Sequence, residues 1–223
     1  MTAPATEGQY GQDITMAALR AALKKAGFAD MIEVGLGGDM TAAYESAEWY
    51  EAHEEGRKMT TSCCPAFINL LKKHYPKVYQ ENMSTIVSPM CAVSRYLKAT
   101  HPGCVTVFIG PCIAKKSEAR EMGIEGNADH VLTYGEMSSI LKSRDIEIVP
   151  VEEDYQEASL MGKGFAASGG VAEAVLSCMK ERGQNTEGIN VRKATGGKEC
   201  IVAVKLLQMG RLPEDSLQPN LIV

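Results

Sequence analysis

Residues 58–65 read KMTTSCCP and lead into an amphipathic stretch that runs from Ala66 to His74. The first four residues have a strand pattern, and Pro65 suits the first position of a helix, where its missing N–H would have no partner anyway. We therefore expect Cys64 at the cap of a helix and Cys63 just before it. Adjacent thiols bridge each other poorly, and one metal rarely takes both, so the pair predicts one ligand and one free thiol.

A second cysteine stands in the same kind of position near the middle of the chain. Residues 105–109 read VTVFI, a buried-strand pattern, and Gly110-Pro111-Cys112 then leads into a helical stretch over residues 113–119. Ligands collect at the carboxyl ends of strands in open α/β sheets. A Gly-Pro turn before a helix is ordinary by itself, and an isolated cysteine is usually a small buried hydrophobe. The significance of Cys112 comes from its pairing with Cys64.

Helical and strand patterns alternate along the rest of the chain, which predicts an α/β fold of mostly parallel sheet flanked by helices. The length of 223 residues suits one large domain or two small lobes. Thr133 and Glu136 have the spacing of a capping box. The remaining expected helices span about 13–26, 39–55, 89–99, 171–181 and 198–209, and the remaining expected strands lie near 31–34, 146–151, 189–194 and 221–223.

Both ends of the sequence look unfinished. Residues 221–223 would end the chain in the middle of a strand, and Ala3-Pro4-Ala5 resembles the exit of a strand whose body is absent. An unpaired edge of this kind is normally covered or completed by more protein. We expect one domain over residues 1–223, truncated at both ends, that can consist of two α/β lobes.

Composition argues against several classes of partner. The net charge is −5, with 23 basic against 28 acidic residues, and no basic run is longer than a pair, so neither nucleic acid nor an anionic membrane is expected. No apolar stretch approaches the roughly 20 residues of a membrane span. Seven cysteines without a secretory segment indicate reduced thiols or metal ligands and a cytoplasmic location. Zinc-type and phosphate-loop spacings are missing. We interpret Cys91, Cys104, Cys178 and Cys200 as core residues.

Three groups of polar or small residues allow two interpretations each. Lys115 lies three positions after Cys112 and could meet an anionic ligand, with Glu118 holding it, although such a segment is more often a solvated helix start. Glu45 and Glu48 could line one helix face and relay a proton, although exposed helical glutamates are far commoner. The stretch 168–170, Ser-Gly-Gly, could admit a bulky cofactor or could be a plain helix entry that needs a positive φ.

Four motifs together resemble, in order and spacing, the catalytic domain of the iron-only ([FeFe]) hydrogenases. The motifs are TSCCP at 61–65, Ser88-Pro89, GPCxxKxxE at 110–118 and SGGVxEA at 168–174. The likeness spans almost the whole chain, and its first motif is highly specific. It implies two α/β lobes around the H-cluster, which is a [4Fe-4S] cubane joined through a cysteine sulfur to a diiron centre carrying CO, cyanide and azadithiolate.

The resemblance also implies a role for each matching residue. Cys64 and Cys112 would be cubane ligands, and Cys63 would pass protons to the bridge amine. Lys115 would contact a cyanide. The remaining implied site residues fall into two sets: the proton route is Glu45, Ser84 and Glu48, and the cofactor-binding residues are Ala3, Pro4, Ser88, Pro89, Gly110, Pro111, Gly169 and Gly170.

The activity that this resemblance implies is the reversible reduction of two protons to dihydrogen. The family's third signature, which supplies the last two cubane ligands, would begin where the chain stops at Val223, so a missing C-terminal segment or a second chain would have to provide them. No upstream Cys-rich ferredoxin-like segment precedes the domain, so electrons would arrive from a ferredoxin-like or other electron-transfer partner.

Departures from the family pattern keep other functions open. Gly110 replaces the usual methionine, and Ala66 and Phe67 replace the usual Gly-Trp, as in the sensory branch of the family. A dihydrogen sensor with the same cofactor is thus one alternative, although the retained Cys63 favours turnover. A non-catalytic iron-sulfur assembly protein of the nuclear prelamin A recognition factor-like group is another. The third is a structural fragment that binds no metal.

Overall fold

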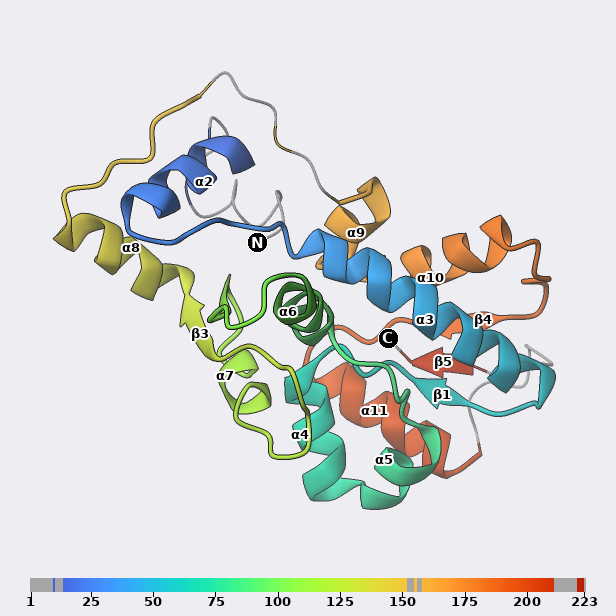
Figure 1. The fold of residues 1–223 in the computed structure, drawn as a ribbon. Helices are drawn as coiled ribbons and strands as arrows, with labels where there is room; N and C mark the ends of the chain where they lie inside the picture. Colours follow the sequence, from blue (N-terminus) through green and yellow to red (C-terminus); the bar gives the residue numbers. More distant parts are fainter. Residues whose placement is uncertain (1–9, 11–13, 152–154, 156–157, 211–219, 223) are drawn as a thin grey trace. The chain divides into compact units, whose positions relative to one another are not determined.

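The structure is a computed structural model, and it describes residues 10, 14–151, 155, 158–210 and 220–222. The chain divides into two compact units, each built from two separate stretches of sequence. Unit 1 comprises residues 1–39 and 89–166, and unit 2 comprises residues 40–88 and 167–223. The 20-residue helix α3 (Gly35–Glu54) contributes its first turn to unit 1 and the remainder to unit 2 (Figure 1). The boundaries expected for a single domain stay a prediction.

Unit 1 contains a parallel pair of strands with helices around it. Strands β2 (Val107–Gly110) and β3 (His130–Thr133) pair in a register that sets Ile109 opposite Leu132. The predicted capping box is confirmed: the Thr133 hydroxyl accepts from the Glu136 N–H, and the Glu136 carboxylate accepts from the Thr133 N–H. The helices of this unit are α2 (Met16–Lys25), α6 (Pro89–Thr100), α7 (Lys115–Glu118), α8 (Tyr134–Ser143) and α9 (Leu160–Gly164).

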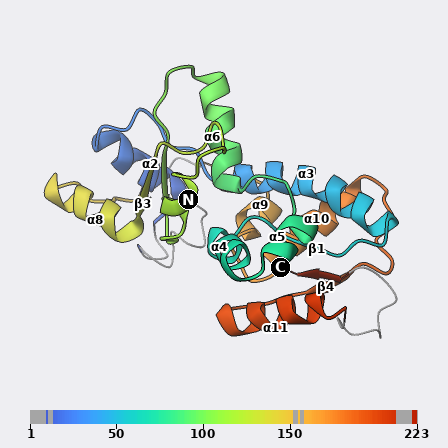
Figure 2. The same cartoon turned by 90° about the horizontal axis from the view of Figure 1, so that it is seen from below.

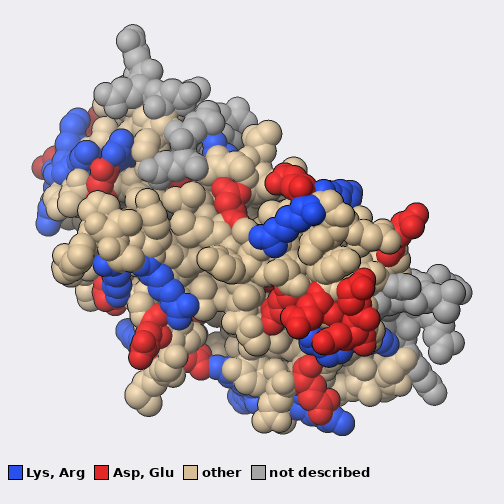
Figure 3. Space-filling view, turned by 45° about the vertical axis from the view of Figure 1, so that its right-hand side comes forward, with Lys and Arg blue, Asp and Glu red and all other residues tan. Residues whose placement is uncertain are grey.

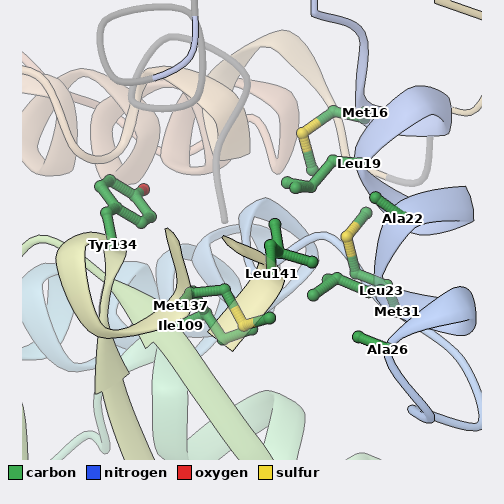
Figure 4. Packing of buried hydrophobic residues seen from close by; sticks show 10 residues of the cluster. All are labelled: Met16, Leu19, Ala22, Leu23, Ala26, Met31, Ile109, Tyr134, Met137 and Leu141. Atoms are coloured by element: carbon green, nitrogen blue, oxygen red, sulfur yellow. The ribbon is translucent and has the colours of Figure 1, made fainter. Parts of the chain in front are cut away.

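The core of unit 1 lies where α2 and α8 pack together over the strands. Leu19 and Leu23 of α2 point toward Leu141 of α8, and Ile109 of β2 lies beside Met137 of the same helix (Figure 4). All five side chains are at most 8% exposed. Burial of each large aliphatic side chain stabilises the fold by about 1.5–3 kcal/mol, so this cluster fixes the strand that leads to Cys112.

Unit 2 is built on a three-stranded parallel sheet in the order β1-β5-β4. Helices α10 and α11 lie on opposite sides of this sheet (Figure 2). Leu71 and Val78 pack with Ala203, Val204 and Leu207 in the main apolar cluster on the α11 side. The elements of this unit are β1 (Met59–Thr60), α4 (Pro65–His74), α5 (Pro76–Asn82), α10 (Gly170–Glu181), β4 (Asn190–Arg192), α11 (Gly197–Gln208) and β5 (Asn220–Ile222).

Three expectations from the sequence need correction. Residues 31–34 and 146–151 belong to neither sheet, because alternating apolar side chains predict burial and not a pairing partner. Helix α3 begins at Gly35 and not near Asp39. A Cβ at Gly37 would lie 2.2 Å from the Pro89 carbonyl oxygen, so close packing against α6 favours glycine inside this helix. The expected cap at Asp13 lies outside the described residues, and Thr15 caps α2.

The distribution of charge on the surface and the character of the helices can be described. On the face shown in Figure 3, basic side chains are scattered and acidic ones gather in one cluster. None of the helices in the described part of the chain combines the length and the apolar character of a membrane span.

Candidate functional site

The adjacent cysteines lie at the start of α4, as the sequence predicts. Strand β1 delivers the chain to Cys64, which is the N-cap residue, and Pro65 takes the first helical position. The Cys64 side chain makes no capping hydrogen bond and is exposed, whereas Cys63 is half-buried. The two neighbouring thiols therefore occupy different environments, and the assignment of one of them as a ligand stays a prediction.

The Cys63 thiol contacts a buried carboxylate. Its Sγ atom donates to Glu45 Oε2 at 3.7 Å, and Glu45 on α3 is fully buried. Burial, and secondly the nearby charge of Glu48, raise the pKa of Glu45 to about 7. Hydrogen bonds from Ser84 and Cys63 act in the opposite direction and are outweighed. A carboxyl with a pKa near neutrality can both accept and release a proton under ordinary conditions.

A second carboxylate continues this polar chain toward solvent. The buried Ser84 hydroxyl donates to Glu48 Oε2 at 2.6 Å and lies close enough to Glu45 to lower its pKa. The exposed Thr85 donates to Glu48 Oε1 from both its N–H and its hydroxyl, each at 2.9 Å. Unit 2 thus holds a continuous series of polar groups from Cys63 through Glu45, Ser84 and Glu48 to the surface.

Backbone contacts fix the loop that presents Ser84 to this chain of groups. The Ser84 N–H donates to the Thr60 carbonyl at 2.8 Å, the Ser62 hydroxyl donates to the Ile86 carbonyl, and the Thr41 hydroxyl donates to the Val87 carbonyl at 3.1 Å. Helix α3, the cysteine loop and the 84–88 loop are therefore tied together. The sequence spacing of Glu45 and Glu48 suggests that the two carboxylates form a pair. The position of Ser84 beside this pair depends on the contacts of the 84–88 loop, which the spacing does not indicate.

Sequence reasoning missed Trp49, the single tryptophan of the chain. Trp49 is 1% exposed and follows Glu45 by one helical turn. Its indole N–H is near enough to lower the pKa of Glu45, but neither Trp49 Nε1 nor Glu45 Oε1 completes a hydrogen bond with the described residues. The ring excludes water from one side of the carboxyl, which contributes to its burial. The four-residue spacing from Glu45 is a signal that could have indicated this contact.

Cys112 lies in unit 1 beside a buried ion pair. It is half-exposed at the carboxyl end of β2, and its carbonyl accepts from the Lys115 N–H at 3.3 Å. Lys115 Nζ lies 2.7 Å from Glu118 Oε2, and the two residues are only 9% and 7% exposed. The Glu118 carbonyl in turn accepts from the Asn127 amide at 3.0 Å. The solvated-helix interpretation of this segment is wrong, because the lysine is buried and held by the carboxylate.

The space beside Gly110, two residues before Cys112, is filled by the ring of Phe108 on the same strand. Gly110 is buried, and a Cβ built on it would lie 2.7 Å from the ring of Phe108. Residues two apart in a strand share one face, so the Phe108 ring occupies the room that a larger side chain at 110 would need. This contact favours glycine at position 110.

The Gly169-Gly170 segment has a local structural explanation. Gly169 caps α10 in the left-handed conformation, with φ 81°, which favours glycine. A Cβ there would also lie 2.3 Å from Lys193 Nζ, and Lys193 pairs with Glu173. The plain helix-entry interpretation of these glycines therefore suffices, and their cofactor-binding role stays a prediction.

The remaining predicted cofactor-binding residues are Ala3, Pro4, Ser88, Pro89 and Pro111. Ala3 and Pro4 lie outside the described residues. Ser88 is 4% exposed at the start of α6, whose first residue is Pro89. Pro111 is exposed at the end of β2. Their roles toward a cofactor stay predictions.

One thiol that the sequence placed in the core lies near the cysteine pair. Cys200 on α11 is half-buried, and its Sγ contacts the Ala194 carbonyl oxygen at 3.7 Å. Burial, followed by the nearby Cys64, raises the pKa of the Cys200 thiol. Its proximity to Cys64 comes from the packing of α11 within unit 2, which no local sequence signal indicates.

The donor chemistry of these residues fits an iron-sulfur group in part. Cys64 and Cys112 offer accessible sulfurs of the type that iron-sulfur clusters require. The described residues contain no cluster of three or more His, Cys, Asp or Glu side chains that could hold a metal ion. An iron-sulfur cluster would therefore need ligands in addition to Cys64 and Cys112.

Comparisons with known proteins show which family the chain belongs to. The family model of the iron only hydrogenase large subunit, C-terminal domain, matches residues 1–211. Iron hydrogenase 1 of Clostridium pasteurianum is 28% identical over 197 residues, which are 80% of this chain and 34% of that protein. The cytosolic Fe-S cluster assembly factor NAR1 of Kluyveromyces lactis is 27% identical over 143 residues, which are 58% of this chain and 30% of that protein.

A solved structure shows the same fold. The apo [FeFe]-hydrogenase HydA1 from Chlamydomonas reinhardtii matches with a TM-score of 0.59 at 26% identity, over 77% of this chain and 50% of that one. The chain spans a third to a half of the length of the relatives it matches. The predicted α/β fold of parallel sheet with flanking helices is confirmed. The chain belongs to the family of the iron only hydrogenase large subunit, whose C-terminal domain it matches along nearly its whole length.

Proposed function

We propose that this chain is a hydrogenase catalytic domain that takes part in the reversible reduction of two protons by two electrons to dihydrogen. The observation that carries the proposal is the series of polar groups that begins at the Cys63 thiol. A protein that only held an iron-sulfur cluster would have no use for a thiol that donates to a buried carboxyl with a pKa of about 7. Such a carboxyl suits proton transfer near neutral pH.

Cys64 and Cys112 would hold the [4Fe-4S] part of an H-cluster, and Lys115 would contact its diiron part. Two further thiolates would come from a C-terminal segment or a second chain. When bound, the H-cluster would supply the iron chemistry that interconverts protons, electrons and dihydrogen. Gly110, Pro111, Gly169, Gly170, Ala3, Pro4, Ser88 and Pro89 would line its pocket.

The residues of this chain would move the protons. The Cys63 thiol would release its proton toward the cofactor and recover one from Glu45. Glu45 would be reprotonated through Ser84 from Glu48, which exchanges protons with solvent beside the exposed Thr85. Each transfer moves one proton and no electrons, so the electrons must enter separately from a ferredoxin-like or other electron-transfer partner. We place this activity in the cytoplasm, without nucleic-acid or membrane partners.

A substitution at Cys63 tests this function. After maturation of the chain together with the remaining ligands, Cys63→Ala should keep the infrared bands of CO and cyanide while dihydrogen turnover falls by about 100-fold or more, the size of effect typical of a lost general acid or base. Cys178→Ala, which changes another half-buried cysteine of unit 2, is the matched control and should retain turnover. Unchanged turnover in a loaded Cys63→Ala protein would refute the proton-donor role.

The similarity to NAR1 favours an iron-sulfur assembly function as the second candidate. That function needs cluster ligands but no proton route. It would be supported if the matured protein carried cluster iron but no CO or cyanide bands. A dihydrogen sensor would instead load the complete cofactor and turn over slowly even with Cys63 intact.

A further inference from the structure

Two complementary polar atoms lie unpaired in the interior of unit 2. Glu45 Oε1 is a hydrogen-bond acceptor and Trp49 Nε1 is a donor, and neither makes a hydrogen bond within the described part of the chain. The two residues are 0% and 1% exposed. Buried polar groups in proteins are nearly always paired, so each of these atoms requires a partner.

The two residues share one side of helix α3. They are four positions apart, and side chains at this spacing are neighbours on the surface of a helix. The indole N–H lies near enough to the carboxyl of Glu45 to lower its pKa. An indole N–H can only donate a hydrogen bond, and an ionised carboxylate can only accept one. A small rotation of either side chain therefore pairs Trp49 Nε1 with Glu45 Oε1.

The ionised form of Glu45 needs a further donor. The Cys63 thiol meets Oε2 at 3.7 Å, and a thiol is a weak donor. The Ser84 hydroxyl also lies close to Glu45, but it donates to Glu48 Oε2 at 2.6 Å. A buried carboxylate is costly unless hydrogen-bond donors meet it. Loss of the proton from Glu45 therefore creates a charge that these contacts satisfy poorly.

We propose that Trp49 is a positioning residue of the proton route: its indole N–H donates to Glu45 Oε1 when this carboxyl is ionised, and so keeps Oε2 directed at the Cys63 thiol. A hydrogen bond to the charged carboxylate is stronger than one to the neutral carboxyl, so the bond forms on ionisation and loosens on protonation. The positioning role rests on the proposed function, whereas the hydrogen bond can be observed without turnover.

Other ionisable groups act near Glu45. Glu48 on the same helix and Cys63 on the cysteine loop both affect its pKa. The Arg182 guanidinium, at the end of α10, donates to the Ser46 hydroxyl at 2.9 Å, next to Glu45 in the sequence. A test of the bond must therefore assign any pH dependence to Glu45 itself.

Other buried acceptors could compete for the indole N–H. His53 lies one helical turn beyond Trp49, and its Nδ1 atom makes no hydrogen bond with the described residues. A histidine titrates at about pH 6.5, close to the value expected for Glu45. Thr60 Oγ1 and Gln184 Oε1 are also buried and unpaired among the described residues, but neither group changes its charge with pH. His53 is therefore the competitor that the experiment has to separate from Glu45.

Nuclear magnetic resonance of the full chain without cofactor tests the bond. Trp49 is the single tryptophan, so protein labelled at the indole nitrogen gives one indole N–H signal. This proton signal should move downfield as the pH rises, with a midpoint of about 7 that follows Glu45. The movement should vanish in Glu45→Gln. It should persist in His53→Gln and in Glu51→Gln, which changes an exposed glutamate of α3.

The proton affinity of Glu45 gives a second readout. Trp49→Phe keeps an aromatic ring but removes the N–H donor. The infrared midpoint of the Glu45 carboxyl should then rise by about one pH unit or more, the shift that accompanies loss of a hydrogen bond to a charged group. Lost packing alone would admit water and lower the midpoint instead. In the matured protein, the pH profile of dihydrogen turnover should move upward by the same amount.

Three outcomes would overturn the proposal: an indole signal that does not change with pH, a titration of this signal that survives Glu45→Gln, or an infrared midpoint that stays or falls in Trp49→Phe. Failure of the proposed function has a different signature. Normal turnover of a loaded Cys63→Ala protein would refute the proton route, while the pH-dependent bond between Trp49 and Glu45 would still be seen in the chain without cofactor.

Discussion

The two units each present a cysteine at the carboxyl end of a strand, but they surround it with different chemistry. Behind Cys63 and Cys64, unit 2 places groups whose protons can move: a thiol, a buried carboxyl with a pKa of about 7, a hydroxyl and a second carboxylate. Beside Cys112, unit 1 places a buried ion pair between Lys115 and Glu118. One region is suited to proton transfer and the other to a fixed charge.

This difference indicates a division of labour between the units. A buried ammonium held 2.7 Å from a carboxylate is fixed in position, which suits the orientation of an anionic ligand. A buried carboxyl near its pKa can change its charge at little free-energy cost, which suits a relay. The predictions below test each half of this contrast, from the largest expected effect to the smallest.

The largest change in the free energy of unfolding is expected at the Lys115–Glu118 pair of unit 1. Glu118→Ala removes the carboxylate that holds the buried Lys115 ammonium, and breaking a buried pair in this way destabilises a protein by about 3–5 kcal/mol. Urea unfolding of the whole chain measures this loss. Lys116→Ala breaks the neighbouring but exposed pair with Glu136 and should change stability by less than about 1 kcal/mol. Equal effects of the two substitutions would remove the contrast between a buried and a solvated pair.

Glu45 of unit 2 should make the free energy of unfolding depend on pH. Because burial raises the pKa of Glu45 from 4.5 to about 7, the folded chain binds more protons than the unfolded chain between these values. The free energy of unfolding should therefore fall as pH rises through this window, by up to about 3 kcal/mol. Glu45→Gln should remove this part of the pH dependence, whereas Glu51→Gln, on the exposed side of α3, should keep it. A Glu45→Gln protein with an unaltered pH profile would contradict the raised pKa.

A smaller effect is expected at the strand end before Cys112. Gly110→Met would overpack against the Phe108 ring and should destabilise the chain by about 1–3 kcal/mol. The double substitution Gly110→Met with Phe108→Ala should recover most of this loss, because the ring then vacates the space. Additive effects in this double-mutant cycle, followed by thermal unfolding, would show that the two residues do not share the space.

Local signals in the sequence predicted much of the framework. Pro65 after Cys64 predicted the helix cap, and Thr133 with Glu136 predicted the capping box, because both depend on the backbone groups of a single turn. Helix α3 starts earlier than its sequence suggests, because the contact of Gly37 with α6 outweighs the low helix propensity of glycine.

The predicted strands at 31–34 and 146–151 failed for a different reason. Most of their apolar side chains are partly or fully buried, with Val149 exposed, and Met31, Ile146 and Ile148 pack in or against the core of unit 1. Strand pairing also needs a neighbouring backbone, which the pattern of one segment cannot reveal.

The candidate site was predicted only where its residues carry a recognisable motif. The cysteines, Lys115 and the two glutamates of α3 could be named from spacing and family resemblance. The burial of Trp49 beside Glu45 and the proximity of Cys200 to Cys64 depend on tertiary packing, and no local pattern around Cys200 indicates its position.

The most direct test of the relay is an infrared pH titration of the Glu45 carboxyl in the chain without cofactor. The signal of the protonated carboxyl, assigned by its loss in Glu45→Gln, should disappear with a midpoint near pH 7. A midpoint near 4.5, the ordinary value for a glutamate, would contradict the claim that unit 2 keeps a carboxyl ready for proton transfer behind Cys63.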